Sequence, residues 1–205
     1  MQSEKRLYLI RALLRERRED LSVPQEEQAQ KRLLRALFNL RSPIPCDAEF
    51  LHVQDEYLRE ETFQKGVTDF AALTPIRPDI YLWQGDITTL KCDAIVNAAN
   101  SALLGCFFPN HGCIDNAIHT YACVQLRLAC SELMAKQGHD EPTGQAKITP
   151  AFNLPCRYVL HTVGPIVGGR LTERDRELLR SCYRSCLSLA DEKHLEYRFL
   201  LYLHR

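Results

Sequence analysis

The sequence predicts an α/β fold preceded by a helical N-terminal segment. From about residue 79, short apolar runs alternate with amphipathic stretches, which is typical of strands and helices packed in layers around a largely parallel sheet. Before that point, helix-forming stretches are interrupted by prolines. With 205 residues, the chain is long enough to bury a full core and to carry one domain plus an extension.

Residues 1–41 are helical in character. Ser22 is followed by Val-Pro-Gln-Glu-Glu, which predicts the start of a second helix with acidic residues in its first turn. Apolar residues recur at helical spacing on both sides of this point: Leu7, Ile10, Leu14, Leu33, Leu37 and Leu40.

A proline-containing run, SPIP at 42–45, ends this unit, and a third helical stretch is expected over about 55–65. We therefore predict a helical extension over 1–78 and an α/β domain over 79–205. The extension either leads into the second domain or packs on it.

Within the second part, five short apolar runs are strand candidates: 80–83, 94–97, 146–149, 158–162 and 198–203. Two longer amphipathic stretches are helix candidates: about 115–136 and about 173–193.

The composition weighs against some classes of partner, although a local basic patch remains possible. Lys+Arg and Asp+Glu both number 26, and this zero net charge weighs against a nucleic acid or an anionic membrane. No apolar stretch is long enough to cross a bilayer and no signal peptide is evident, so we expect a cytoplasmic protein. In that setting, the nine cysteines are expected to be buried thiols or metal ligands rather than disulfides.

Three polar residues are expected at strand ends, where open α/β sheets bind ligands. Asp86 follows the run 80–83 and can accept hydrogen bonds from an exocyclic amine or a ribose hydroxyl. Asn97 and Asn100 end the next strand. Each residue alone is more simply a turn or capping residue, but their joint occurrence favours a nucleotide-type ligand.

Cys106, His111 and Cys113 form a C-x4-H-x-C cluster. Two thiolates and one imidazole can hold a tetrahedral zinc ion, and three local ligands leave a fourth position open. The alternative is a loop that contains these residues and binds no metal.

The cluster leads into a predicted helix, whose free N–H groups and positive dipole end favour a diphosphate. Asp115 is either a cap of this helix or a group that positions a reacting sugar. We expect a structural role for His119 and a satisfied core position for His161. Neither a GxGxxG fingerprint nor a GxxxxGK[ST] loop is present, so hydride transfer and NTP hydrolysis lack support.

Taken together, QGDIT, DAIVNAAN, CIDNAIH, PTGQAKIT and YVLHTVGP resemble the macrodomain, the ADP-ribose-binding three-layer α/β/α fold with a mixed, mostly parallel sheet. GCFFPNHGC stands where most macrodomains have a glycine-rich loop. This substitution is similar to the zinc-containing microbial branch, whose members are protein-ADP-ribose hydrolases with a helical N-terminal extension.

The resemblance implies roles for individual residues. Asp86 would contact the adenine, the Ile87 backbone a phosphate, and Asn100 the distal ribose. Asn100 and Asp115 would be the catalytic residues. One zinc ion per chain would be held by Cys106, His111 and Cys113, and the diphosphate and ribose would be lined by Ile114, Asp115 and Asn116.

The function so implied is zinc-dependent removal of mono-ADP-ribose from proteins by cleavage at the anomeric carbon of the distal ribose. A lipoyl-carrier-like target and a sirtuin-type transferase are the implied partners. Macrodomains continue past the strand at 198–203 with a phosphate loop and a helix, so we expect the last strand or strands and a helix to be missing here. A non-catalytic ADP-ribose-binding module and an inactive truncated relative remain alternatives.

Overall fold

The main sheet of this computed structural model, which describes residues 1–195, has three strands in the order β5–β7–β6. Strand β5 (Ala94–Ala99) runs parallel to β7 (Tyr158–Val163), and β6 (Ala146–Pro150) runs antiparallel to β7. The three strands were all predicted, and the sheet is mixed. The last of the five predicted runs, at 198–203, lies outside the described residues.

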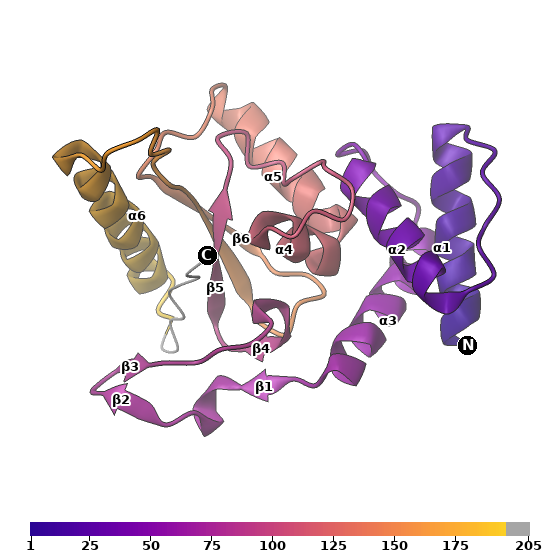
Figure 1. The fold of residues 1–205 in the computed structure, drawn as a ribbon, viewed down its shortest axis with the longest axis horizontal. Helices are drawn as coiled ribbons and strands as arrows, with labels where there is room; N and C mark the ends of the chain where they lie inside the picture. The colour runs from indigo at the N-terminus through magenta and orange to yellow at the C-terminus, as the bar shows by residue number, and fades with distance from the viewer. Residues whose placement is uncertain (196–205) are drawn as a thin grey trace.

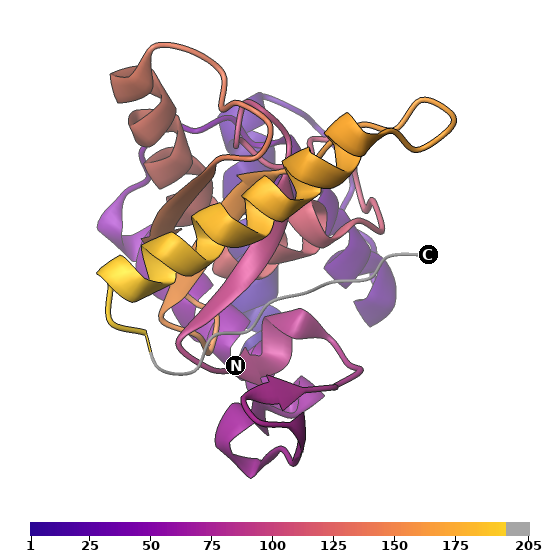
Figure 2. The same ribbon diagram turned by 90° about the vertical axis from the view of Figure 1, so that its left-hand side faces the viewer.

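Helices cover both faces of this sheet, which confirms the three-layer α/β/α architecture. Helix α6 (Glu173–Glu192) lies across one face, as Figure 2 shows. Helices α4 (Ile114–Ala122) and α5 (Val124–Gln137) cover the other face (Figure 1). Fully buried Ile95, Ile118 and Leu126 belong to one core cluster between the sheet and these two helices. Burial of such apolar side chains is the main force that holds the layers together.

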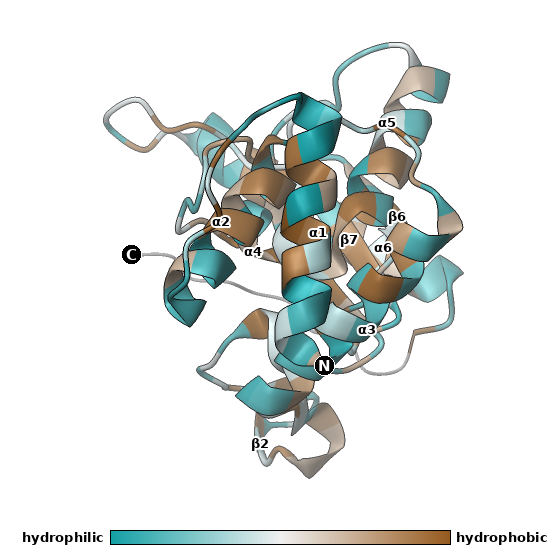
Figure 3. Ribbon diagram, turned by 90° about the vertical axis from the view of Figure 1, so that its right-hand side faces the viewer, coloured by the Kyte–Doolittle hydropathy of each residue, from teal (hydrophilic) through white to brown (hydrophobic). Residues whose placement is uncertain are grey.

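The helical extension forms a further layer outside α4 and α5 (Figure 1). It consists of α1 (Gln2–Arg17), α2 (Glu27–Leu40) and α3 (Ala48–Lys65). These helices share a core cluster that also includes Cys123 and Val124, and α2 packs against α4. Hydrophobic and hydrophilic residues alternate along these helices (Figure 3), as expected for helices that bury one side. None of the described helices is long and apolar enough to cross a membrane.

Two helix starts differ from the sequence prediction because of capping. The second helix begins after Glu26, whose carboxylate accepts hydrogen bonds from two N–H groups of the first turn, and not at Ser22. The third helix begins at Ala48 rather than near residue 55, because Asp47 caps it by accepting a hydrogen bond from the Phe50 N–H.

Short elements join the extension to the sheet. They are β1 (Thr68–Asp69), a 3₁₀ turn η1 (Phe70–Ala72), β2 (Pro75–Arg77), β3 (Ile80–Tyr81), a 3₁₀ turn η2 (Ile87–Thr89) and β4 (Leu90–Lys91). β1 pairs with β4, and β2 with β3. The strand predicted at 80–83 is therefore part of this small hairpin and not of the main sheet.

The single helix predicted over about 115–136 is wrong, because the chain turns at Cys123. This residue has φ +74° and separates α4 from α5. The break carries Arg127, in the first turn of α5, to the C-terminal end of α2. There its guanidinium donates hydrogen bonds to the carbonyls of Phe38, Asn39 and Arg41. These carbonyls have no partner within their own helix, so Arg127 joins the extension to the α/β layers.

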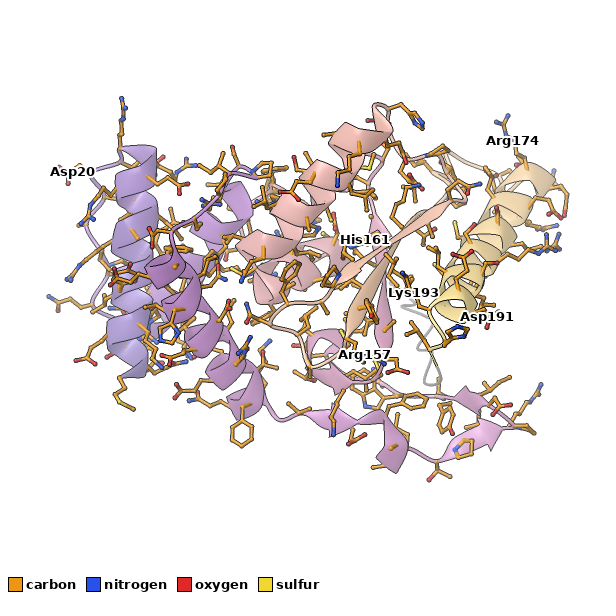
Figure 4. All side chains as sticks on the ribbon, turned by 180° about the vertical axis from the view of Figure 1, so that it is seen from behind. Asp20, Arg157, His161, Arg174, Asp191 and Lys193 are labelled. Carbon is orange, nitrogen blue, oxygen red and sulfur yellow. The ribbon has the colours of Figure 1, made fainter. Side chains whose placement is uncertain are left out.

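The histidine of β7 is a satisfied core residue, as predicted. His161 is fully buried in the middle of the molecule (Figure 4). Its Nδ1 lies 3.2 Å from the Asn97 amide nitrogen, and its Nε2 lies 2.9 Å from the Thr149 hydroxyl. Burial lowers the pKa of His161 to about 4. Burial also lowers the pKa of His119 well below its ordinary value.

These two histidines predict a pH-dependent stability. Both stay neutral in the folded chain, whereas the unfolded chain protonates them near pH 6.5, so the unfolded state binds more protons as the pH falls. We expect the free energy of unfolding to drop between pH 7 and pH 5, by about 2 kcal/mol from His161 and further from His119. For His161 the loss continues until about pH 4. Urea unfolding over this pH range measures the slope.

A His52→Gln variant is the control, because His52 is exposed on α3. The variant should keep the wild-type slope. A free energy of unfolding that stays constant from pH 7 to pH 5 would contradict the burial of two neutral histidines.

Candidate functional site

Asp86 is an ionised carboxylate that caps η2. Its Oδ1 accepts hydrogen bonds from the N–H group of Thr88 at 3.0 Å and from the Thr88 hydroxyl at 2.6 Å. Its Oδ2 accepts one from Lys65 Nζ at 2.9 Å. Burial raises the pKa of Asp86, but these partners outweigh it and hold the pKa below its usual value. The side chain is 45% exposed, so the carboxylate is accessible to a ligand.

The setting of Asp86 differs from the prediction, because β3 does not belong to the main sheet. The residue owes its position to η2, which contacts α4. The side chains of Ile87 and Ile114 are buried in the main core cluster. Any ligand contact by these two residues would therefore use their backbone.

Two asparagines at the end of β5 converge on the start of α4. Asn97 is fully buried and donates a hydrogen bond from Nδ2 to Asp115 Oδ1 at 2.8 Å. Asn100 follows the last residue of β5, and its Nδ2 lies 3.0 Å from the Gly105 carbonyl oxygen and 3.4 Å from Asp115 Oδ2. The strand-end amides predicted from the sequence thus hold both oxygens of one carboxylate.

Asp115 occupies the first turn of α4 and is almost fully buried. Burial raises its pKa, although the Asn97 hydrogen bond and the positive charge of Arg127 act in the opposite direction. Its Oδ1 also lies 3.5 Å from His119 Nε2. Within the described residues, neither ring nitrogen of His119 has a hydrogen-bond partner. The cap of α4 is Cys113, so Asp115 is not the capping residue.

The predicted metal ligands lie together in the segment 105–113, which we call the metal loop. Cys106 Sγ lies 3.6 Å from His111 Nδ1, and these two atoms and Cys113 Sγ all lie within 4.8 Å of one another. Two sulfurs and one imidazole nitrogen at this separation fit a tetrahedral zinc ion and leave a fourth position free. The loop starts close to the core: a Cβ on Gly105, which has φ +79°, would lie 2.7 Å from His119 Cγ.

Asn116 lies beneath the metal loop and is fully buried. Its Nδ2 donates to the carbonyl oxygens of Phe108, at 3.0 Å, and of Cys106, at 3.3 Å. Its Oδ1 accepts from Arg35 Nη2 at 2.8 Å. Both polar groups of this side chain are therefore engaged within the protein.

Two contributors from the extension could not be found by sequence reasoning. Lys65, at the end of α3, pairs with Asp86 and also lies 3.4 Å from the centre of the Tyr121 ring. Arg35, in α2, contacts the metal loop. In sequence, both are ordinary basic residues of amphipathic helices, and their partners are 21 to 81 residues away.

The chain is similar to several known proteins. Residues 96–198 match the Macro domain family. A protein-ADP-ribose hydrolase of Treponema medium is 57% identical over 197 residues, which cover 93% of this chain and 76% of the relative. The protein-ADP-ribose hydrolase of Staphylococcus aureus strain MRSA252 is 48% identical over 194 residues, covering 93% of this chain and 73% of the relative.

Among solved structures, the Trypanosoma brucei macrodomain in complex with ADP-ribose is similar, with a TM-score of 0.55 and 32% sequence identity. The match covers 78% of this chain and 69% of that one. With these matches and an α/β/α core that presents strand-end amides to the start of α4, the chain belongs to the macro domain family, and its curated relatives place it among the hydrolases of that family.

Proposed function

We propose that this chain is a zinc-dependent hydrolase that removes mono-ADP-ribose from modified proteins. The observation that carries the proposal is the convergence at the start of α4. Asn100 donates to the carbonyl directly before Cys106 and lies beside Asp115, which follows Cys113 by two residues. Residues 97–115 thus contain the amides of Asn97 and Asn100, the carboxylate of Asp115 and the three proposed zinc ligands. The names of the Treponema and Staphylococcus relatives support the same activity.

ADP-ribose would extend from Asp86 to the metal loop. Asp86, ionised and half-exposed, would accept hydrogen bonds from the exocyclic amine of the adenine. The backbone at Ile87 and at the first turn of α4, residues Ile114, Asp115 and Asn116, would bind the diphosphate, because helix N-termini favour anions. Asn100 would hold the distal ribose.

The reaction breaks the bond between the anomeric carbon of the distal ribose and the modified side chain, for which we propose an acidic residue linked as an ester. The leaving carboxylate takes the bonding electron pair, and a water oxygen bonds to the carbon. Asp115 would position the ribose or accept a proton from this water. A zinc ion held by Cys106, His111 and Cys113 would supply a Lewis-acid position for a ribose hydroxyl or a water.

For the partner, we propose a lipoyl-carrier-like protein modified by a sirtuin-type transferase. This part of the proposal is supported by the resemblance of GCFFPNHGC to the zinc-containing microbial branch. Hydrolysis of ADP-ribosylated carrier, compared with hydrolysis of a generic modified protein, tests it.

The adenine contact predicts the effect of Asp86→Ala. We expect the affinity for ADP-ribose, measured by calorimetry, to fall by at least about tenfold, because a charged hydrogen-bond acceptor contributes about 1.5–3 kcal/mol. The zinc content should not change.

Asp69→Ala is a matched control. Asp69 also caps a 3₁₀ turn, accepting from the Ala71 N–H, and also pairs with a lysine, Lys91, at 2.8 Å. The control removes the same local interactions away from the site. Equal loss of affinity in the two variants would show that Asp86 acts only on the fold.

The metal ligands predict the effect of Cys106→Ser. We expect the bound zinc to fall from one per chain to a small fraction, and hydrolysis of a mono-ADP-ribosylated protein to fall with it, because serine is a poor zinc ligand. Cys46→Ser, which alters a half-buried thiol outside the cluster, should keep both. Full zinc occupancy in Cys106→Ser would rule out this donor set.

The proposed catalytic role predicts the effect of Asp115→Asn, which keeps the size of the side chain. We expect kcat to fall by about 10²–10⁴, the usual range for a general base. Zinc content and ADP-ribose affinity should change much less, because the asparagine keeps one oxygen that can accept the hydrogen bond from Asn97. Asp93→Asn, which alters a carboxylate beyond the opposite end of β5, should leave kcat unchanged. An Asp115→Asn variant with wild-type kcat would remove this residue from the reaction.

A further inference from the structure

Helix α2 of the extension contacts the metal loop at two consecutive residues. Arg35 Nη2 donates a hydrogen bond to the His111 carbonyl oxygen at 2.9 Å. Asn39 Oδ1 accepts one from the Asn110 N–H at 2.9 Å. Arg35 and Asn39 are four residues apart, so they lie on the same side of α2. Two hydrogen bonds from one face of α2 therefore hold the backbone of His111, one of the three proposed metal ligands, and of its neighbour Asn110.

The same guanidinium also reaches the loop from below, through Asn116. Arg35 donates to Asn116 Oδ1 from Nη2 at 2.8 Å and from Nε at 3.3 Å. Because the oxygen of the amide is held by Arg35, its nitrogen is directed to the carbonyls of Cys106 and Phe108. Arg35 thereby acts on both ends of the loop, directly at His111 and through Asn116 at Cys106.

Asn39 is anchored in the same way. It is buried, and its Nδ2 donates to the Thr120 hydroxyl at 2.9 Å. Thr120 in turn donates to the Asn116 carbonyl oxygen at 2.7 Å. The acceptor that holds Asn110 is therefore fixed to α4, the helix that follows the metal loop.

The loop requires such support. Asn110 has φ +56°, a left-handed conformation that non-glycine residues adopt rarely. Phe108 is 69% exposed, and His111 is exposed as well, so packing of the loop against the core is limited. Arg35 is directed at neutral acceptors, a carbonyl and an amide, and no ion pair of this residue is found in residues 1–195. The contacts of Arg35 therefore position the His111 carbonyl and the Asn116 side chain, and they do not neutralise a charge.

We propose that helix α2 holds the metal loop in the conformation that binds zinc, with Arg35 and Asn39 as positioning residues. This inference rests on the zinc site of the proposed function, and it gives the helical extension a role in building that site. Groups that fix the geometry around metal ligands typically change metal affinity by about 10–100-fold when they are removed.

The test compares zinc release from Arg35→Met and Arg32→Met. Methionine keeps most of the aliphatic length of arginine and removes the donors. Arg32 is exposed on the same helix, and its side chain makes no hydrogen bond within the described part of the chain. Zinc-loaded full-length protein is mixed with a chromophoric chelator. We expect release to be about 10–100-fold faster for Arg35→Met and unchanged for Arg32→Met.

A second measurement needs no metal. In zinc-free protein, hydrogen exchange of the Asn110 amide should accelerate at least about tenfold in Asn39→Ala and in Arg35→Met, whereas the amides of β7 should keep their protection. Retained protection of β7 shows that the chain remains folded. Because the two variants remove different contacts, the test survives if either one alone fails to fold.

The outcomes separate this inference from the proposed function. If the wild-type chain binds one zinc ion and neither release nor Asn110 exchange changes in the variants, the role of α2 is overturned and the zinc site stands. If the wild-type chain binds no zinc but the variants accelerate Asn110 exchange, the zinc site is overturned and the support of the loop by α2 stands.

Discussion

The pair of hydrogen bonds between Asp115 and the asparagines of the β5 end is the interaction on which the rest of the site depends. Asn97 holds one carboxylate oxygen from inside the strand, and Asn100 lies against the other from beyond it. A carboxylate buried without such partners would be costly, so the two elements are held in one relative position. That position also fixes Cys113, which is both the cap of α4 and the last residue of the metal loop. The relative position of the β5 asparagines, Asp115 and the metal loop thus follows from one strand–helix contact.

Buried polar groups extend this contact through the molecule. His161 lies within hydrogen-bond distance of Asn97 and of Thr149, which extends the polar contacts across the sheet. Asn116, the residue after Asp115, accepts a hydrogen bond from Arg35 of the extension beneath the metal loop. Networks of this kind are stable only when most members have partners, and they then specify a single arrangement. The extension is therefore joined to the α/β layers by polar contacts as well as by apolar packing. A helical segment far from the sheet thus contacts the metal loop.

Sequence reasoning succeeded where the determinants are local. The strands at 94–97 and 158–162 are apolar runs that are buried on both faces. The three proposed zinc ligands lie within eight positions, so their proximity follows from chain connectivity. It failed at Cys123, because helix-forming residues flank the break and neither glycine nor proline marks it. It also missed Arg35, since a surface-type arginine in an amphipathic helix carries no sign of a partner 76 residues away.

A crystal structure of the full chain with zinc and ADP-ribose, with anomalous data at the zinc edge, tests the central claim most directly. We expect one anomalous peak bonded to Cys106, His111 and Cys113, the distal ribose beside Asn100 and Asp115, and the adenine at Asp86. A zinc peak at other side chains, or ADP-ribose bound away from the start of α4, would contradict it.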